Sequence, residues 1–381
     1  MTWVAMTQLP EFALETYFAR WEFTARYNLT ASDAQAVSLA RLLELADPAD
    51  RAEWESLSLG YTPTRGAPSL REAIAATYDV VAAGDIMTFV PGEAITSVMR
   101  ALLAPDDHVI TVIPNYASAE NVPRSLCEVT GVPLRPEDGW DLDTDAIAAA
   151  LRPSTRLIAV NFPNNPTGAV PSPGQWRALI DLARERGVYL FSDEIYRGVE
   201  RDPDRTLPQA ADLYERAISL GGLSKAHGLP GLRVGWIACR DPEVLDRAER
   251  VKHYGSICSA APSEVLARIA LKAGDTLLAA TRDLIARNRP RFAEFFARHA
   301  DLFSWSPPDG GCVCYPRYLG PDGVEAFCRA AVQDGGVLLL PASVYASPLA
   351  PLPADRFRVG IGRADAPESL AALEEFLARR G

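Results

Sequence analysis

Residues 219–236 read SLGGLSKAHGLPGLRVGW and place a single lysine, Lys225, among glycines, leucines and small residues. No carboxylate lies within this run to pair with it. A surface lysine needs no glycines around it, and a buried lysine without a partner is costly. A lysine that forms a covalent bond to a ligand explains the setting, because glycines let the backbone pack close to that ligand.

The run begins in one of several short apolar segments that predict buried strands. These segments are 86–90, 108–113, 156–162, 188–192 and 217–220. Helical patterns lie between them at 97–104, 143–152 and 174–187, and Gly187 is placed to end the last one. This alternation predicts an α/β fold with a mainly parallel sheet covered on both faces. Ligands of such sheets bind beyond the carboxyl ends of the strands.

The chain is predicted to form two domains and an N-terminal segment. The segment 1–45 is expected to pack with the small domain, 46–275 forms the large domain, and 276–381 forms a small α+β domain. A long helical region is expected over 241–278, bent near 258–262. The small domain is expected to hold a helix near 280–299, a strand pair at 312–317 and 336–341, and a strand at 357–362. The proline-dense stretch 341–355 predicts a surface loop.

Composition excludes several classes of protein. A net charge of −11 over 381 residues argues against nucleic acid or an anionic membrane as the main partner. No apolar run reaches the ~18 residues of a membrane helix, and residues 1–12 lack the pattern of a signal peptide. The six scattered cysteines predict reduced thiols and a cytoplasmic protein. Cys312 and Cys314 lack further ligands at suitable spacing, so no metal site is expected.

Three loops that follow predicted strands carry polar side chains. NFPNNPTG, residues 161–168, supplies Asn165; Asp193 and Tyr196 follow the next strand; Lys225 and Arg233 follow the third. Asp193 alone would fit a helix N-cap. As a set, these residues match pyridoxal phosphate, which needs a lysine for its aldehyde, an acid opposite its ring nitrogen, donors to its ring oxygen and a cation for its phosphate.

The blocks NFPNNPTG, SDEIY and LSKAHGLPGLRVGW resemble those of the class I/II aminotransferases, the pyridoxal phosphate enzymes of fold type I. The resemblance runs from about Leu59 to Arg363 with the blocks in the family's order. The wider sequence, which includes HYGSICSAAPSE (253–264), also resembles a subgroup of this family. That subgroup includes the capreomycidine synthases, which cyclise a hydroxylated arginine. The family resemblance implies a mainly parallel seven-stranded sheet flanked by helices, with a smaller α+β domain.

The resemblance implies roles around the cofactor ring. Lys225 would form the Schiff base and Asp193 would face the pyridinium nitrogen. Asn165, assisted by Tyr196, would hydrogen-bond the phenolic oxygen. Tyr116, in IPNYAS, would stack on the ring; it would otherwise be an ordinary tyrosine at a strand end.

Further roles concern the phosphate, the substrate and a second subunit. Arg233 would clamp the phosphate, and Tyr61, in LGYTPTRG, would reach the phosphate of a neighbouring subunit. An obligate homodimer with shared active sites follows. Arg358 in FRVGIG would grip the substrate's α-carboxylate as a bidentate pair; only the resemblance distinguishes it from Arg356 and Arg363.

Two blocks depart from the family. The phosphate-cradling turn, VPGEAITS, is one or two residues short, although helix-terminal amides could still hold a phosphate. Those amides belong to Gly92, Glu93 and Ala94. Gly222 replaces a hydroxyl three residues before the lysine. His227 stands where an aromatic residue is common, either as a packing substitute or as a proton carrier.

The expected function is that of a pyridoxal phosphate enzyme acting on an amino acid. A transaminase, with a keto-acid acceptor, is the first hypothesis. A cyclase that expels a β-hydroxyl from a hydroxylated arginine is the second, with Glu11 and Glu15 as a possible acidic patch for its guanidine. A sensor domain of a transcription regulator is rejected, because the first 60 or so residues show no helix-turn-helix pattern.

Overall fold

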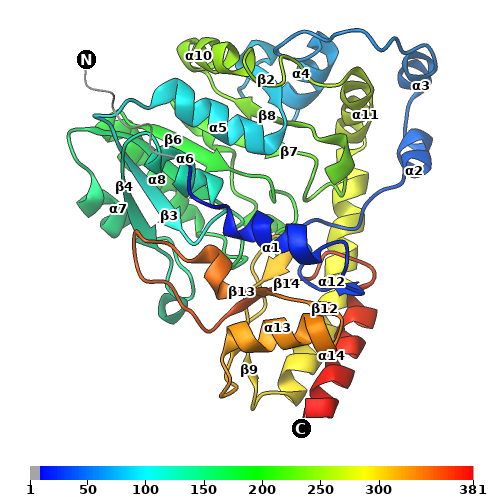
Figure 1. Cartoon of the computed structure of the whole chain (residues 1–381). Coiled ribbons are helices and arrows are strands. Elements are labelled where there is room, and N and C mark those ends of the chain that lie inside the picture. The colour runs from blue at the N-terminus through cyan, green and yellow to red at the C-terminus, as the bar shows by residue number, and fades with distance from the viewer. Residues whose placement is uncertain (1–8, 381) are drawn as a thin grey trace.

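The computed structural model describes residues 9–380 and is built around a seven-stranded sheet (Figure 1). The strands are β2 (Ile86–Phe89), β3 (His108–Ile113), β4 (Glu128–Pro133), β5 (Thr155–Asn161), β6 (Tyr189–Asp193), β7 (Ala217–Gly222) and β8 (Gly235–Ala238). They lie in the order β2-β8-β7-β6-β5-β3-β4. The strand β8 is antiparallel to both of its neighbours, β2 and β7, and all the other neighbouring pairs in this sheet are parallel. The predicted α/β fold with a mainly parallel seven-stranded sheet is confirmed.

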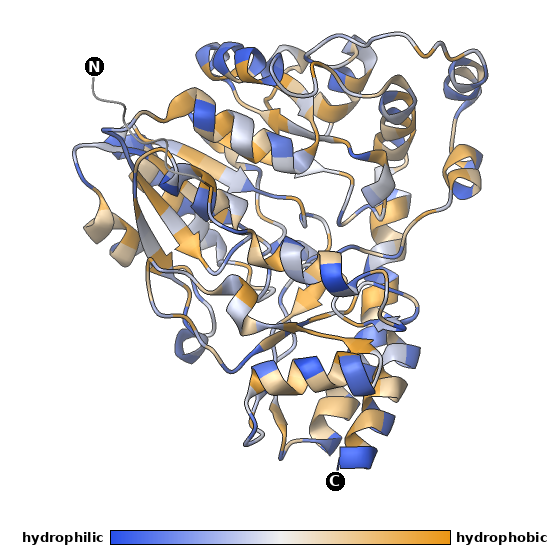
Figure 2. Ribbon diagram, viewed as in Figure 1, coloured by the Kyte–Doolittle hydropathy of each residue, from blue (hydrophilic) through white to orange (hydrophobic). Residues whose placement is uncertain are grey.

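Both faces of the sheet are buried. In β5, Leu157 and Ala159 belong to one apolar core, and Ile158 and Val160 belong to another. Alternate residues of a strand point to opposite faces, so helices must cover both. One core includes α5 (Pro91–Leu102), α6 (Ser118–Arg124) and α10 (Pro242–Lys252); the other includes α7 (Thr144–Ala150), α8 (Pro173–Arg186) and α9 (Ala210–Leu213). Figure 2 shows the strands as mostly hydrophobic between helices of mixed character.

The helix α8 illustrates how local sequence sets an element's ends. Ser172 accepts a hydrogen bond from the Gln175 amide, and the Gln175 side chain accepts one from the Ser172 amide, which forms a capping box. At the other end Gly187 takes a left-handed conformation with φ of 64°. The predicted stop at Gly187 is confirmed, because glycine adopts this conformation without steric cost.

The C-terminal part packs three helices around short strands. The helices are α12 (Gly274–Arg298), α13 (Val324–Asp334) and α14 (Ala366–Arg380), and the strands are β9 (Phe303–Ser304), β10 (Val313–Cys314), β11 (Arg317–Tyr318), β12 (Val337–Leu338), β13 (Leu340–Pro341) and β14 (Phe357–Gly360). The N-terminal strand β1 (Tyr27–Asn28) pairs in parallel with β12. Leu29 and Ala34 share a core with Phe292 and Phe327. The division into domains at 45/46 and 275/276 stays a prediction; the second boundary falls in the first turn of α12.

The remaining elements complete the described chain. They are α1 (Ala13–Trp21), α2 (Leu39–Glu44), α3 (Pro48–Glu55), α4 (Pro68–Ala75) and α11 (Ala261–Lys272), with short 3-10 helices η1 (Ala83–Asp85), η2 (Pro136–Asp138), η3 (Pro203–Arg205), η4 (Pro230–Leu232) and η5 (Ala342–Tyr345). In Figure 1, α1 crosses between the central sheet and the C-terminal part. It therefore lies where the two parts meet.

Several sequence-based expectations are corrected. The region 241–278 is not one bent helix, because 253–260 is non-helical and separates α10 from α11. Segments 312–317 and 336–341 do not pair with each other, since β14 lies between β10 and β13. The stretch 341–355 is not only a surface loop, because Val344 and Tyr345 are buried. The strands β4 and β8 were not predicted.

Within residues 9–380, no helix is long and apolar enough to cross a bilayer. The same part of the chain has no group of three or more His, Cys, Asp and Glu residues that could hold a metal ion. The six cysteines are free thiols. The expected lack of a signal peptide concerns mainly residues 1–8, which lie outside the described residues.

Candidate active site

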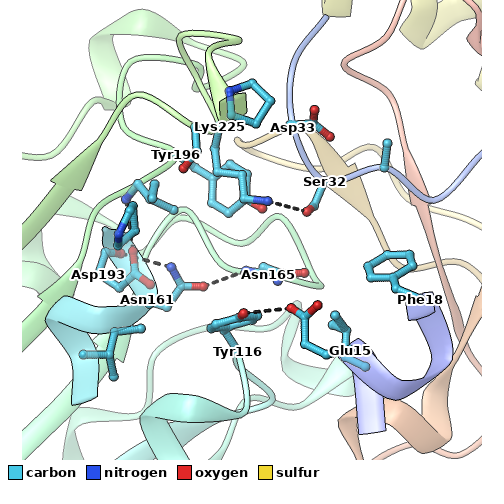
Figure 3. Close-up of a pocket in the computed structure, with 18 of the residues that line it drawn as sticks. Glu15, Phe18, Ser32, Asp33, Tyr116, Asn161, Asn165, Asp193, Tyr196 and Lys225 are labelled. Carbon is cyan, nitrogen blue, oxygen red and sulfur yellow. Dashed lines mark hydrogen bonds between the residues drawn. The ribbon is translucent and has the colours of Figure 1, made fainter. Parts of the chain in front are cut away.

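The carboxyl ends of the adjacent strands β5, β6 and β7 meet at a cavity of about 350 Å³ (Figure 3). The N-terminal segment and β14 close it from the opposite side. The predicted site residues that line it are Gly92, Tyr116, Asn165, Asp193, Tyr196, Lys225, Arg233 and Arg358. The predicted residues outside its lining are Tyr61, Glu93 and Ala94.

The Lys225 amine lies in the middle of the cavity and points toward the N-terminal segment (Figure 3). Its Nζ donates a hydrogen bond of 2.9 Å to Ser32 Oγ. Burial lowers the pKa of the Lys225 ammonium; nearby Asp33 opposes this shift and Arg358 adds to it. A lowered pKa increases the fraction of free amine, which is the nucleophilic form.

Asp193 ends β6 in a fully buried setting. Burial raises the pKa of its carboxyl from 3.8 to about 7, and the neighbouring Glu194 adds to this. One carboxylate oxygen accepts a hydrogen bond of 3.2 Å from the Ile195 amide, and the Asn161 side chain donates to the Asp193 carbonyl at 3.0 Å. Asp193 forms no ion pair within the described chain. An ionised carboxylate here calls for a cationic group on the ligand.

Arg358 is 1% exposed and anchors the other end of the cavity. Its Nη1 donates to Tyr345 Oη at 2.7 Å and to Asn165 Oδ1 at 3.1 Å, and its Nη2 donates to the Thr30 carbonyl at 2.8 Å. The guanidinium lies 5.6 Å from the centre of the Phe18 ring. A buried guanidinium without a carboxylate partner is suited to an anionic group of a ligand.

The two neighbouring arginines have other partners. Arg356 lies over the Trp140 ring at 4.9 Å and donates to the Tyr315 carbonyl, outside the cavity. Arg363 lines the cavity, but its Nη2 donates to both carboxylate oxygens of Asp33 at 2.9 Å. Of the three arginines, Arg358 alone faces the cavity without a carboxylate of its own.

Two tyrosines face the space between Lys225 and Asp193. The Tyr116 hydroxyl donates to Glu15 Oε1 at 2.9 Å, and burial raises its pKa. Tyr196 is 2% exposed, and its buried hydroxyl makes no hydrogen bond of ordinary geometry within the described residues, although Ser32 lies beside it. Such an unpartnered hydroxyl is available to a ligand oxygen.

The helix α5 points its N-terminus at the cavity without a side-chain cap. The amides of Gly92 and Glu93 lie in its first turn, where no intrahelical acceptor exists, whereas the Ala94 amide donates to the Val90 carbonyl. No heavy atom lies within 4 Å of the place where a Gly92 Cβ would stand, which leaves room for an anion. The Ala94 side chain lies in the apolar core instead.

The other predicted phosphate groups differ in their surroundings. The Glu93 carboxylate binds the Ser256 amide and hydroxyl, outside the cavity lining. Arg233 is exposed, takes a positive φ of 55°, and donates to the Pro230 carbonyl at 3.1 Å. Tyr61 is 93% exposed and lies outside the cavity lining.

The two departures from the family pattern have distinct environments. A Cβ at Gly222 would stand 3.2 Å from Ile195 and 3.3 Å from Pro91, so the site is tight. Ser224, directly before Lys225, lines the cavity and is a hydroxyl that the sequence did not single out. His227 lines a different cavity together with Glu194, and burial lowers its pKa to about 4. His227 therefore lies outside the candidate active site.

Of the residues that reach the cavity from the N-terminal segment, sequence analysis named only Glu15, which it offered together with Glu11 as a possible acidic patch. Glu15 lines it, whereas Glu11 lies in a separate cavity between α1 and α13. Phe18, Glu22, Ser32 and Asp33 also line it, as do Asn161 and Arg363. The only signal available was the helical spacing of residues 15, 18 and 22, which places side chains on one face of α1.

Comparison with known proteins identifies the family. Residues 34–374 match the model for "Aminotransferase class I and II". The chain belongs to this family. It is 31% identical over 376 residues to capreomycidine synthase of Streptomyces vinaceus, with 97% of this chain and 94% of that protein covered. The resemblance inferred from the sequence motifs is thus confirmed.

Solved structures agree with this assignment. A PLP-dependent aminotransferase from Streptococcus suis superimposes with a TM-score of 0.90 at 27% identity and covers 98% of both chains. The PLP-dependent cyclase OrfR superimposes with a TM-score of 0.86 at 26% identity over the full length of both chains. The chain is therefore a pyridoxal phosphate enzyme of the aminotransferase family.

The residues present fit this cofactor. The Lys225 amine, whose pKa burial lowers, is suited to the cofactor's aldehyde, and the buried Asp193 carboxyl group is suited to its ring nitrogen. The unpartnered Tyr196 hydroxyl fits the phenolic oxygen, and the uncapped start of α5 fits a phosphate. The Tyr196 hydroxyl has no hydrogen-bond partner among the described residues, and Asp193 has no ion-pair partner among them, so both are available to the cofactor.

Proposed function

We propose that the enzyme is an aminotransferase that binds an amino acid between Arg358 and Lys225 and removes its α-proton. The carrying observation is the placement of a lysine amine with a lowered pKa between a buried carboxylate and a buried guanidinium. Pyridoxal phosphate, when bound, supplies an aldehyde that condenses with amines and a ring that delocalises the electrons of the substrate's α-carbon.

The side chains have separate roles in this proposal. Arg358 would bind the α-carboxylate, and Lys225 Nζ would accept the α-proton of the substrate. Asp193 keeps the ring nitrogen protonated, since a carboxylate held in a dry site favours a cation beside it. Asn165 and Tyr196 donate to the phenolic oxygen. The Asn165 side-chain oxygen accepts hydrogen bonds from the Tyr345 hydroxyl at 3.0 Å and from Arg358 Nη1 at 3.1 Å, so the NH2 group is the part of this side chain that remains to donate.

The phosphate is assigned to the opposite end of the cavity. The amides of Gly92 and Glu93 and the Arg233 guanidinium would hold it, with the Ser224 hydroxyl in place of the one missing at Gly222. The Ala94 amide is already used within α5, so it plays no direct part.

The proposal extends to oligomeric state and location. Tyr61 is exposed on the single chain and completes the phosphate site of a second subunit, which makes the enzyme a homodimer with shared sites. Leu59, close to Tyr61 in the sequence, and Tyr254, far from it in the sequence, are also exposed apolar side chains, 82% and 96% exposed. Both are therefore available to a second subunit. The free thiols favour a reducing compartment, the cytoplasm.

A second candidate reaction is cyclisation of a hydroxylated arginine. Similarity to capreomycidine synthase over 97% of the chain, and to the cyclase OrfR over the whole chain, favours it. In this reaction the substrate loses its β-hydroxyl as water after the α-proton has left, and a guanidine nitrogen adds to the alkene. Both candidates share the first step, so the same residues serve either.

Turnover without an amino acceptor tests the choice between the two. An aminotransferase converts its cofactor to the amine form, so an amino acid alone gives one equivalent of keto acid and bleaches the visible absorbance. A keto acid then restores the absorbance. Repeated turnover without a keto acid, with a cyclic guanidino amino acid detected by mass spectrometry, would establish the cyclase instead.

A further inference from the structure

The helix α1 supplies one wall of the cavity. Glu15, Phe18 and Glu22 are spaced by three and four residues, so they lie on one face of the helix end. Figure 3 shows Glu15 turned toward Tyr116, with Phe18 beside it on the same helix. Glu22 follows the last helical residue and lines the same cavity. The wall is acidic on either side of an aromatic ring.

Three carboxylates face the cavity from the N-terminal segment, and they differ in their partners. Asp33 is paired with Arg363, and Glu15 accepts the Tyr116 hydroxyl. Glu22 makes no hydrogen bond through its carboxylate and no ion pair among residues 9–380. Partial burial raises the pKa of the Glu22 carboxyl and the negative charges of Asp33 and Glu15 add to this, while the positive charges of Arg363 and Lys225 oppose it.

This arrangement leaves Glu22 as the least compensated of the three carboxylates. Like charges that converge in a partly dry site destabilise one another unless a cation joins them. Asp33 is paired with Arg363 and Glu15 accepts the Tyr116 hydroxyl, so Glu22 is the carboxylate that lacks a contact partner and has only the longer-range attraction of Arg363 and Lys225. A cation brought by the substrate would relieve both the repulsion and the missing contact.

The position of Glu22 suits the far end of a substrate. Arg358, which takes the α-carboxylate, lies over the Phe18 ring at 5.6 Å. Glu22 lies four residues beyond Phe18, a rise of roughly 6 Å along a helix. A side chain of several carbons can therefore extend from the carboxylate site along Phe18 to Glu22.

We propose that Glu22 selects the substrate side chain, and that the enzyme takes an α-amino acid whose side chain ends in a guanidinium or an ammonium group. Glu15 and Asp33 add negative potential without contacting the cation directly. The inference rests on the proposed function, since it assumes that Arg358 holds the α-carboxylate. It goes further by naming Glu22 as the residue that binds the charged end of the substrate's side chain.

Arginine and citrulline provide the test, because citrulline has nearly the shape of arginine without its charge. Their dissociation constants are measured by titration calorimetry on cofactor-loaded Lys225→Ala protein, in which turnover does not interfere. A charge-assisted hydrogen bond stabilises binding enough that arginine should bind roughly 10- to 100-fold more tightly than citrulline. Adding Glu22→Gln should reduce this ratio nearly to one and leave the citrulline constant unchanged.

Glu11→Gln is the matched control, because Glu11 is an exposed glutamate beside α1 that lines a different cavity. It should keep the full preference for arginine. Glu22→Lys should abolish arginine binding and improve binding of glutamate, an outcome that a purely structural role for Glu22 does not produce.

Three outcomes would contradict the inference. An unchanged preference for arginine in Glu22→Gln would show that Glu22 does not read the charge. Equal loss of arginine and citrulline binding in a folded Glu22→Gln protein would show that Glu22 only positions α1. If neither the loaded parent protein nor wild type bound any amino acid, the proposed function itself would fail, and the inference with it.

Discussion

Replacing Asp193 by Asn should have opposite effects on the cofactor-free and the cofactor-loaded protein. The substitution keeps the size of the side chain and removes its charge. Without cofactor, that charge is buried and is supported by a single amide hydrogen bond from Ile195. As a result the pKa of the carboxyl rises from 3.8 to about 7.

The magnitude follows from the two pKa values. Between pH 3.8 and 7 the folded protein holds a proton on Asp193 that the unfolded chain has released. Stability therefore falls as pH rises, by about 1.4 kcal/mol per pH unit for one group. The Asn variant has no carboxyl to ionise at this position, so its stability does not fall with pH for this reason. Relative to wild type, its free energy of unfolding should rise by about 2.3 kcal/mol from pH 5 to pH 7, because the folded carboxyl is half ionised at pH 7, and level off above about pH 8.

Urea unfolding of the cofactor-free proteins over this pH range measures the difference, with Glu11→Gln as a control whose difference from wild type stays small. With cofactor loaded, Asp193→Asn should lose roughly 100-fold in turnover, ~3 kcal/mol of barrier, because the ring nitrogen loses its counter-charge. A stability difference that does not vary with pH would refute the burial argument. Wild-type turnover would mean that Asp193 only holds the turn at Ile195.

Three further predictions concern attachment, assembly and substrate binding. Borohydride reduction of the yellow holoenzyme should fix the cofactor on Lys225, and a label on another lysine in the peptide map would contradict this. Mixing inactive Tyr61→Phe and Lys225→Ala subunits should restore activity through one intact site per mixed dimer; a monomer by sedimentation would exclude it. Arg358→Lys should weaken amino-acid binding roughly 10-fold or more by calorimetry while the cofactor absorbance persists, because one ammonium replaces a bidentate guanidinium.

The strands that the sequence predicted are those whose two faces are both buried. β5, β6 and β7 read as continuous apolar runs for this reason. β4 escaped prediction because it is an edge strand that begins at the exposed Glu128 and includes Gly131. β8 is buried but has only four residues after a glycine-rich loop, so it lacks the length that marks a strand.

The active site likewise contains residues that the sequence predicted and residues that it did not. Lys225, Asp193 and Asn165 were found because parallel neighbours bring the residues after their strands to one edge. Ser32 lies 193 residues before Lys225, its hydrogen-bond partner. No periodicity links positions so far apart, and only packing of the N-terminal segment brings them together.

That packing has a consequence for specificity. The segment that carries Glu22 is tied to the C-terminal part through β1 and β12, and to the Lys225 loop through the Ala34 amide, which donates to the Lys225 carbonyl at 3.1 Å. The motif residues on β5, β6 and β7 supply a step that transamination and cyclisation share, so they do not distinguish the two. The substrate's far end meets the N-terminal wall instead. Substitutions along α1 should therefore change which amino acid is accepted while the borohydride-reducible link at Lys225 remains.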